Sequence, residues 1–441
     1  MEVGRRPAAQ SRRREPDGAR PLRIALVTET FLPKIDGIVT RLCHTIRHLR
    51  AFGHTVLVIA PEGVGEFEGV PVHGVPGFPF PIYPELKLAL PRPSIGAALD
   101  AFCPDLIHAI NPAVLGVSAF FYSAGHDVPL VVSYHTHLPK YLQYYGLGSL
   151  EGLMWLGLRE GYNRADLTLA TSRAMRAELE AKGIRRVRLW RRGVDTELFH
   201  PGRASQAMRA RLTEGHPDER LLLYVGRLSA EKEIERFRDV LEAIPRVRVA
   251  LVGDGPHRQK LAQHFAGTPT YFAGFLQGEE LASAFASADA FFLPSQTETL
   301  GLVLLEAMAA GCPVATPRAG GTADIVQDGV TGHLYDPAQP LGAVEAIARL
   351  LLDSEHRARL SRQARLDAEL WGWDAATRQM ETYYRELMHR EERLPGLIAQ
   401  HRAAGQRVDA ICSQLAISRQ TFRRHARELA RAGQHRRAGV S

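Results

Sequence analysis

Cysteine is scarce in this chain, and the few cysteines are scattered. Cys43, Cys103, Cys312 and Cys412 are the only four in 441 residues, and no C-x-x-C pair occurs. Neither a disulfide framework nor a thiolate zinc site is therefore indicated. A reducing compartment is the simpler interpretation, so we expect a cytoplasmic protein, with a peripheral contact to the inner face of the membrane left open.

Long hydrophobic runs are also missing. The apolar stretch that follows the Arg-rich N-terminus, Leu22 to Val27, is too short for the core of a signal peptide. The most apolar long segment, 106–125, is interrupted by His108, Asn111 and Pro112 and falls short of a spanning helix. The sequence therefore predicts a soluble protein.

Excess positive charge is absent from the body of the chain. The formal net charge is +7, but residues 395–441 hold nine Arg against Asp409 and Glu428, and residues 1–20 hold six Arg against three acidic residues. The basic isoelectric point therefore belongs to the two ends and does not describe the central part.

Two nucleotide-binding signatures do not occur. The loop after the first predicted strand, TETFLPKIDGIVT, has a single glycine, Gly37, where a dinucleotide enzyme needs G-x-G-x-x-G. No D-x-D occurs anywhere, so the usual carboxylate pair for a metal-bound diphosphate is missing. Nicotinamide binding is disfavoured, no cofactor or metal is expected, and phosphate charge would fall to cationic side chains and helix amides.

Short apolar strands alternate with helical patterns through most of the chain. The alternation predicts an α/β fold with two Rossmann-like, doubly wound domains facing a cleft. A helix is expected at 38–52, and Asn111 is expected to cap a helix opened by Pro112. The predicted strands are 23–27, 55–60, 105–110, 130–134 and 166–170, then 221–225, 247–252, 271–273, 290–293 and 313–315.

The segment SQTETLGLVLLEAMAAG, 295–311, carries Glu298 and Glu306 with seven residues between them. Its apolar run predicts a mostly buried helix over 300–310, capped by Thr297 or Thr299 and ended by Gly311. A buried ionised Glu306 needs hydrogen-bond donors, and the free amides at the helix start favour an anion. Hydroxyls beside a phosphate fit a nucleotide sugar, whereas an internal Arg partner for the glutamate is the structural alternative.

A basic pair follows the first strand of the second half. GRLSAEKEIE places Arg227 and Lys232 near a strand's carboxyl end, where the two cations can neutralise two phosphates. The alternative is a solvated, charged helix start. The glycine turn Gly253 to Pro256 and the loop Gly274 to Leu276 end the next two strands at the same edge of the sheet.

The first half offers a histidine pair and an aromatic segment. In His135-Thr136-His137, no third metal ligand stands at a recognisable spacing, and His135 is the better candidate to face a ligand cleft. Residues 141–162 are rich in Tyr, Leu and Trp, which fits either core packing against the sheet or contact with a lipid.

The motifs GRLSAEK, GDGP, GFLQGEEL and SQTETLGLVLLEAMAAGCPV occur in this order. Together they resemble the nucleotide-sugar half of the retaining GT-B glycosyltransferases of the family 4 type, over roughly residues 23–384. Within that family, SYHTH, RADLTL and RLWRRGVDTELFHP look closest to the sulfoquinovosyltransferases. Lipid mannosyl- and glucosyltransferases are the near alternative, because the first loop, TETFLPKIDG, looks more like theirs.

The resemblance implies roles for individual residues. Glu306 would hold the ribose hydroxyls and Glu298 would contact the sugar ring, while Arg227 and Lys232 would bind the diphosphate. His135 would lie beside the transferred sugar. Further substrate contacts are implied for Gly37, Gly253, Phe275, Leu276, Thr299, Leu300, Gly301 and Leu302.

The resemblance also implies a domain plan. A disordered basic arm (1–20) would precede an acceptor-side domain (21–200) and a nucleotide-sugar domain (201–370). A helix (371–394) would cross back to the first domain before a basic appendage (395–441). Two positions depart from the family pattern: Asp36 stands where relatives have glycine, and Glu233 where they have a small residue.

The implied activity is metal-independent, retaining hexosyl transfer from a nucleotide-diphosphate sugar to a hydroxyl acceptor. A UDP-sugar such as UDP-sulfoquinovose or UDP-glucose and a diacylglycerol-type lipid are favoured; the alternative is a GDP-mannose-dependent lipid or glycan mannosyltransferase. The expected partners are the donor, a lipid or glycan acceptor and a peripheral membrane contact.

The C-terminal segment suggests a function of another class. Apolar spacing predicts two short helices around a turn at 416–418, and the second carries Arg419, Arg423, Arg424 and Arg427. RVDAICSQLAISRQTFRRHAREL resembles a helix-turn-helix, so the segment would bind nucleic acid, rest on an anionic membrane or dock on the protein. The rival function is a DNA-binding regulator with a sugar-nucleotide-binding domain.

Overall fold

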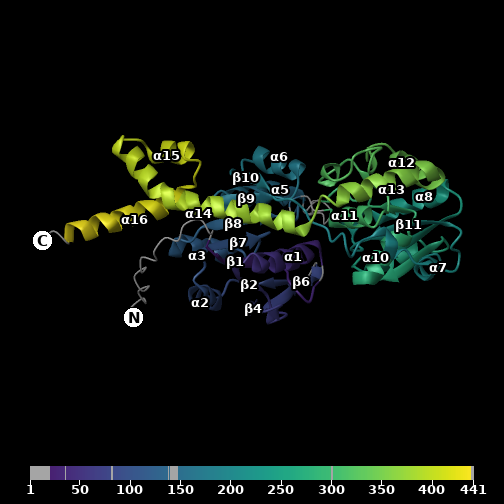
Figure 1. Ribbon diagram of the computed structural model, residues 1–441, viewed down its shortest axis with the longest axis horizontal. Helices are drawn as coiled ribbons and strands as arrows, with labels where there is room; N and C mark the ends of the chain where they lie inside the picture. The colour runs from purple at the N-terminus through teal and green to yellow at the C-terminus, as the bar shows by residue number, and fades with distance from the viewer. Residues whose placement is uncertain are drawn as a thin grey trace.

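The computed structural model describes residues 20–34, 36–80, 83–137, 139, 148–298 and 301–438, without the side chains of 79–80, 83–87 and 431–438. The predicted N-terminal arm lies outside these residues except for Arg20. Two α/β lobes stand side by side, and a long helix runs back along the first of them (Figure 1).

The first lobe is built on an eight-stranded sheet with the order β10-β9-β8-β7-β1-β2-β4-β3. Its pairings are parallel except for β3 with β4. Its strands are β1 (Arg23–Thr28), β2 (Thr55–Pro61), β3 (Glu66–Phe67), β4 (Val70–Val75), β7 (Leu106–Ile110), β8 (Leu130–Tyr134), β9 (Leu167–Ala170) and β10 (Val187–Leu189). Its helices are α1 (Gly37–Ala51), α2 (Pro93–Phe102), α3 (Val117–His126), α5 (Glu151–Tyr162) and α6 (Arg173–Ala181), and β5 (Gly77–Phe80) and β6 (Tyr83–Ala89) form a separate antiparallel pair.

The second lobe is built on a six-stranded parallel sheet with the order β13-β12-β11-β14-β15-β16. Its strands are β11 (Arg220–Val225), β12 (Val247–Val252), β13 (Thr270–Gly274), β14 (Ala290–Phe292), β15 (Val314–Pro317) and β16 (Gly332–Tyr335). Its helices are α7 (Gln206–Leu212), α8 (Phe237–Ala243), α9 (Arg258–His264), α10 (Gly278–Ser287), α11 (Leu302–Ala309), α12 (Gly342–Leu352) and α13 (Ser354–Ala368). Short 3-10 turns lie at Gly148–Leu150, Pro201–Arg203, Ala230–Lys232, Ile234–Arg236 and Thr322–Asp324.

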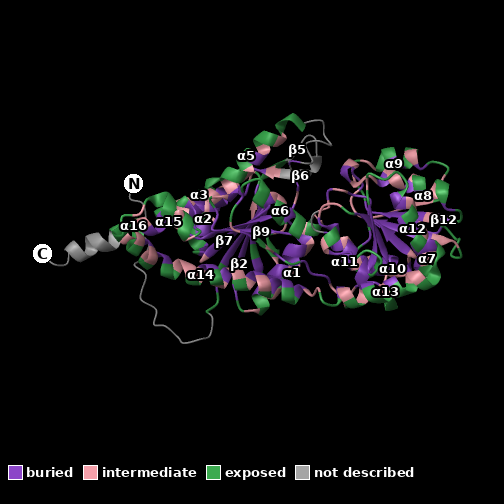
Figure 2. Cartoon of the chain, turned by 90° about the horizontal axis from the view of Figure 1, so that it is seen from above, coloured by how far each residue is buried: buried purple, intermediate pink, exposed green. Residues whose placement is uncertain are grey.

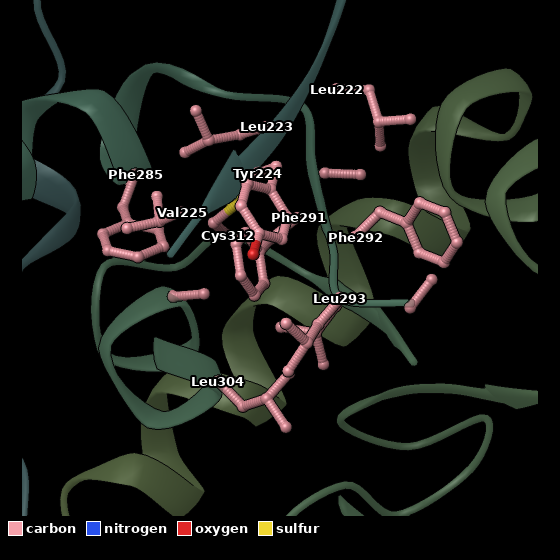
Figure 3. Packing of buried hydrophobic residues seen from close by; sticks show 14 of the residues in the cluster. Leu222, Leu223, Tyr224, Val225, Phe285, Phe291, Phe292, Leu293, Leu304 and Cys312 are labelled. Carbon is pink, nitrogen blue, oxygen red and sulfur yellow. The ribbon is translucent and has the colours of Figure 1, made fainter. Parts of the chain in front are cut away.

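Both sheets are covered on both faces, as parallel sheets require (Figure 2). Along β1, Ala25 and Val27 join one buried cluster, whereas Ile24 and Leu26 join another on the opposite face. In the second lobe one continuous cluster joins β11, β14 and α11, and Figure 3 shows Leu304 of α11 near Leu293 just after β14. The doubly wound α/β prediction is confirmed, and each predicted strand is present with ends within two residues.

The predicted cap at Asn111 is wrong. The next helix, α3, begins only at Val117, and Asn111 adopts a left-handed backbone with φ of 48°. Its side-chain oxygen accepts hydrogen bonds from the amides of His135 and Thr136, at 3.1 and 3.0 Å. The amides of 113–116 donate to the carboxylate of Glu29 instead, because that side chain reaches them from the end of β1.

The chain returns to the first lobe through α14 (Trp373–Ala403). Met380, Tyr384 and Leu387 of this helix join the buried cluster on one face of the first sheet. The helix continues through Pro395, so the expected start of the appendage at that residue falls inside it. No helix among the described residues is long and apolar enough to cross a membrane.

The two predicted C-terminal helices are present as α15 (Val408–Gln414) and α16 (Arg419–Ala438). They pack on the end of α14 through a small apolar cluster of Leu394, Ile398, Ile411, Ile417 and Phe422. Figure 1 shows α16 extending beyond the first lobe at the end opposite the second lobe.

Of the four arginines predicted on the second helix, Arg424 is buried in α16 and the other three are exposed. Arg424 is 3% exposed and pairs with Asp166 of the first lobe and with Glu391 of α14. Arg419 pairs with Asp409, and Arg427 with Asp127, while Arg423 is exposed. Of the three interpretations of this segment, docking on the protein is the arrangement that its contacts form.

Candidate active site

The site lies where the strands of the second sheet end, in the loops after β11, β12 and β14. Two of these loops touch through glycine: Gly253 has φ of 131°, and a Cβ built on it would lie 1.9 Å from the carbonyl oxygen of Gly226. A side chain at Gly253 would therefore push apart the two loops that form the floor of the site.

Lys232 and Glu298 meet although 66 residues separate them. Lys232 Nζ donates to Glu298 Oε2 at 2.9 Å, and the amide of Gly301 donates to Glu298 Oε1 at 2.8 Å. Burial disfavours the lysine's charge, but the Glu298 carboxylate outweighs it and holds the pKa of Lys232 above its usual range. The site therefore carries a fixed cation beside a carboxylate.

Arg227 adds a second cation at the end of β11. Burial lowers its pKa to about 10, against the opposing effect of Glu231 and Asp36. The influence of Asp36, which caps α1, places the first lobe within electrostatic reach of Arg227. Because Glu231 is 1% exposed and receives a hydrogen bond from Ser229 at 2.6 Å, the E-K-E run is not a solvated helix start.

Helix α11 is buried on most sides, as predicted, but Thr297, one of its two predicted caps, does not cap it. Gly301, with φ of 62°, is the residue before the helix, and no side chain caps it. Thr297 donates to the carbonyl of Glu231 instead, at 3.4 Å, and Thr299 lies outside the described residues. Gly311 ends the helix with φ of 73°, as predicted.

Glu306 lies on α11, partly buried, and burial raises its pKa to about 7. Within the part of the chain that the structure describes, its carboxylate has no hydrogen-bond or ion-pair partner. No Arg among the described residues pairs with Glu306, so the internal Arg that the sequence left open as an alternative is not found there. Hydroxyl groups of a bound ligand would stabilise the charged form of this carboxylate by donating hydrogen bonds to it.

The two histidines after β8 lie in different surroundings. His135 is 3% exposed; its Nε2 is 2.9 Å from the hydroxyl of Ser133, and its ring packs edge-on against Trp190. Burial, together with Arg41 and His108, lowers its pKa well below the usual range, so its ring is neutral. His137 Nε2 lies 2.9 Å from Glu178 Oε1.

A cavity of about 320 Å³ lies between the two lobes. His137, not His135, reaches it. The lining residues are His137, Glu151, Ala174, Met175 and Glu178 from the first lobe and Gln296, Thr297 and Gly320 from the second. The cavity is therefore bordered by the segment just before Glu298 on one side and by the first lobe on the other.

The other predicted residues that the structure describes lie next to the ends of strands and helices. Phe275 is 56% exposed and Leu276 is buried, both just after β13. Gly37 begins α1, whose first amides donate to Asp36 at 3.0 Å. Thr299 and Leu300 lie outside the described residues. Among the residues described, no cluster of His, Cys, Asp or Glu is arranged to hold a metal ion.

Sequence reasoning missed Arg192, Gln296 and the turn at 320–321. Arg192 is 3% exposed in the segment between the lobes, and Gln296 binds Glu233 at 3.0 Å. A Cβ on Gly320 would lie 2.4 Å from the carbonyl oxygen of Glu298. The paired glycines at 320–321 and the double arginine at 191–192 were the available signals, but neither indicates its partner.

Known families and known proteins match most of this chain in sequence. The family described as Glycosyltransferase Family 4 matches residues 35–198, and Glycosyl transferases group 1 matches residues 210–367. The chain is 42% identical to the sulfoquinovosyl transferase SQD2 of Arabidopsis thaliana, over 81% of this chain and 72% of that protein. It is 33% identical to a GDP-mannose-dependent alpha-mannosyltransferase of Corynebacterium glutamicum, over 85% of this chain and 92% of that protein.

Solved structures of low sequence identity share the fold. Anabaena Alr3699/HepE, crystallised with UDP-glucose, has a TM-score of 0.69 at 22% identity and covers 82% of this chain and 99% of its own. Sucrose-phosphate synthase from Thermosynechococcus elongatus has a TM-score of 0.68 at 23% identity over 83% and 99%. The chain therefore belongs to the GT-B glycosyltransferases of the family 4 type, which transfer a sugar from a nucleotide-sugar donor.

Proposed function

We propose that this enzyme transfers a hexose, with retention of anomeric configuration and without a metal, from a UDP-sugar to a hydroxyl of a diacylglycerol-type lipid. UDP-sulfoquinovose and UDP-glucose are the favoured donors, since SQD2 of Arabidopsis is the 42% identical relative. The observation that carries the proposal is the contact of Glu298 with Lys232 and with the amide of Gly301, just before α11. The same helix carries Glu306, whose carboxylate has no partner among the described residues.

Each group has a role that its surroundings support. Glu306 accepts the ribose hydroxyls, since its carboxylate has no hydrogen-bond donor in the part of the chain that the structure describes. Arg227 and Lys232 stabilise the charge that grows on the departing diphosphate, because cations fixed in a site with little water need no reorganisation during reaction. Glu298, already bonded to Lys232 and to the amide of Gly301, contacts sugar hydroxyls rather than acting as a nucleophile.

The other predicted contacts complete the donor site. His135, neutral and held by Ser133, supports the sugar from the first lobe. Gly37 allows the first loop to approach the donor and the acceptor, and Gly253 keeps the phosphate loops together. Phe275 and Leu276 border the base, and the amides at the start of α11 face the sugar or phosphate.

A lipid acceptor accounts for an exposed apolar face on α5. Leu153 is 67% exposed and Leu156 46%, while Trp155 of the same helix is buried in the core. The helix begins at Glu151, which lines the cavity between the lobes. A bilayer in contact with this face would deliver a lipid hydroxyl close to the cavity, so we assign the peripheral membrane contact to α5. The aromatic residues at 141–147 lie outside the described part of the chain.

A second donor is favoured by particular relatives. GDP-mannose-dependent alpha-mannosyltransferases of Corynebacterium glutamicum and Mycolicibacterium smegmatis are 33% and 39% identical to this chain. Mannosyl transfer from GDP-mannose to a lipid or glycan is therefore the second candidate activity.

The experiment is a donor screen with the full chain. UDP-glucose, UDP-sulfoquinovose, UDP-galactose and GDP-mannose are each incubated with diacylglycerol vesicles, with and without EDTA. Nucleotide release is measured by chromatography, and the product's anomeric configuration by NMR. We expect turnover of one UDP-sugar, unaffected by EDTA, with retention at the anomeric carbon.

Variants of the site separate this proposal from a chance activity. K232A should lower kcat by roughly 10²–10³, as removal of one preorganised charge-stabilising donor does in other enzymes. K260A is the matched control, because Lys260 is an exposed lysine on α9. Unchanged turnover of every donor in both K232A and E306A would rule out the assignment.

A further inference from the structure

Arg192 is a buried cation with no place in the proposed chemistry. It lies in the segment that links the two lobes and is 3% exposed. Burial lowers its pKa to about 10, while the carboxylates of Asp324 and Glu298 act in the opposite direction. A buried guanidinium costs several kcal/mol unless it is matched, so its position calls for an explanation.

The contact of Arg192 leads directly to the donor loop. Its Nη2 donates to the carbonyl oxygen of Gly321 at 3.3 Å, and the amide of Gly321 donates to the carbonyl oxygen of Glu298 at 2.7 Å. The neighbouring Gly320, with φ of 58°, lies so close to Glu298 that a Cβ there would clash with the same carbonyl. The main chain of Gly321 thus bridges the side chain of Arg192, through its carbonyl, and the carbonyl of Glu298, through its amide.

The same turn is where the first lobe meets the second. The amide of Arg173, the first residue of α6, donates to the carboxylate of Asp324. Segment 320–324 therefore contacts the first lobe through Asp324 and the linker through the carbonyl of Gly321. Through the amide of Gly321 it also contacts Glu298, in the loop after β14. A shift in the linker would move Glu298, whose carboxylate is fixed on Lys232 and on the amide of Gly301.

We infer that Arg192 is a positioning residue for sugar transfer. Through the main chain of Gly321 it keeps Glu298 in contact with Lys232. The donor site is therefore complete only while the linker lies against segment 320–324. The inference rests on the proposed function, because it gives Glu298 the contact with the donor sugar.

The test is a double-mutant cycle on the full chain. R192Q should lower kcat about tenfold to hundredfold, since a displacement near 1 Å of a substrate contact has that effect, while the dissociation constant for free UDP changes less than about threefold. In R192Q/E298Q the loss should equal that of E298Q alone. Additive losses in the double variant would overturn the inference, because Arg192 would then act independently of Glu298.

Two matched variants exclude a general loss of structure. R191Q changes an exposed arginine beside Arg192 and should keep wild-type kcat. R192K retains the charge at the buried position and should recover part of the activity that R192Q loses. Equal kcat in R192K and R192Q would show that the cation is not what holds the turn.

Amide hydrogen exchange decides the point without any turnover. Peptides covering 296–298 and 318–324 should exchange faster in R192Q than in wild type and R191Q, while strands β11 and β12 remain protected. Unchanged exchange in these peptides would overturn the inference. If the wild type turns over none of the donors, the proposed function fails, and the exchange result alone still decides the role of Arg192.

Discussion

At the scale of single residues, the ligand contact proposed for Glu306 comes with a cost in stability for the free protein. Its partly buried carboxylate lacks a partner among the described residues, and its pKa is raised to about 7. An unfolded glutamate has a pKa of about 4.3. The native state therefore binds the proton more tightly than the unfolded state, and Glu306 lowers stability progressively from about pH 4 to pH 7.

E306Q should therefore stabilise the free protein at alkaline pH. At pH 8 we expect its free energy of unfolding to exceed that of wild type by about 1–2 kcal/mol, a value reduced for partial solvent screening. The gain should mostly disappear at pH 4, where the native carboxyl is protonated. Urea unfolding of both proteins at the two pH values measures the difference.

E345Q is the control for this prediction, because Glu345 is exposed on α12. It should change stability little at either pH. A pH-independent gain in E306Q would show that the carboxylate is not under strain, and the argument for a ligand hydroxyl at this position would fail.

At the scale of elements, the docking of α16 depends on Arg424. This residue is 3% exposed between Asp166 at the start of β9 and Glu391 of α14, and Thr421 also donates to Asp166. R424A leaves Asp166 buried without its cation and takes one of two partners from Glu391, which keeps His425, so we expect it to lower the free energy of unfolding by about 3–5 kcal/mol. Thermal and urea unfolding measure the loss.

R423A changes the neighbouring, exposed arginine and should lie within about 0.5 kcal/mol of wild type. Equal stability of R423A and R424A would mean that α16 does not dock in solution. The arginines would then be free for nucleic acid or an anionic surface, as the sequence had left open.

The outer face of α5 carries a separate prediction. L153E/L156E should abolish co-sedimentation with phosphatidylglycerol vesicles and lower turnover of vesicle-borne acceptor, since charges on this face oppose insertion into a bilayer. Binding of free UDP, measured by calorimetry, should stay unchanged. L352E alters an exposed leucine at the end of α12, in the other lobe, and should sediment like wild type. Sedimentation of L153E/L156E with the vesicles would remove α5 from the membrane contact.

These elements also show what local sequence can predict. The predicted strands are short apolar runs followed by a turn. Strands β3 to β6, β10 and β16 were not predicted. For β4 and β5 the reason is that VPVHGVPGFPF mixes proline and glycine with its apolar residues and lacks a clean period. The cap of 113–116 was missed because its acceptor, Glu29, lies 84 residues away from Ala113 and only the sheet brings it there.

The site divides in the same way. The positions of Lys232, Glu298 and Glu306 follow from motifs that end strands or begin a helix. The direct bond between Lys232 and Glu298 does not, because it depends on how far two loops reach across the sheet edge. Arg192 was missed, and His135 was preferred to His137, for the same reason. The partner of Arg192 is Gly321 in the other lobe and the partner of His137 is Glu178 on α6, and spacing along the chain does not encode those contacts.

At the scale of the whole molecule, two crossings between the lobes run side by side. The amide of Val194, on the way out, donates to the carbonyl of Trp371, on the way back, at 2.7 Å. Trp373 lies at this junction: its ring stacks on His44 of α1 at 4.7 Å and packs against Leu302 at the start of α11. One indole ring therefore contacts the first lobe and helix α11 of the second lobe.

G193A should disturb this junction. A Cβ at Gly193 would lie 2.3 Å from the indole of Trp373, so the ring or the linker must move. Such overpacking typically costs 1–3 kcal/mol, and here it should also change the angle between the lobes. We expect kcat/KM for the donor to fall at least about tenfold, as for other small misplacements near a reacting group.

G372A is the matched control, because Gly372 pairs with Val194 in the same junction but a Cβ there would meet nothing within 4 Å. Small-angle scattering of both variants with and without UDP measures the arrangement of the lobes, and donor kinetics measure its consequence. Both substitutions add one methyl group to the same junction. Only the methyl group of G193A collides with Trp373, so a difference between the two variants reports that collision. Identical scattering and kinetics in G193A and G372A would show that the indole does not link the position of the first lobe to α11.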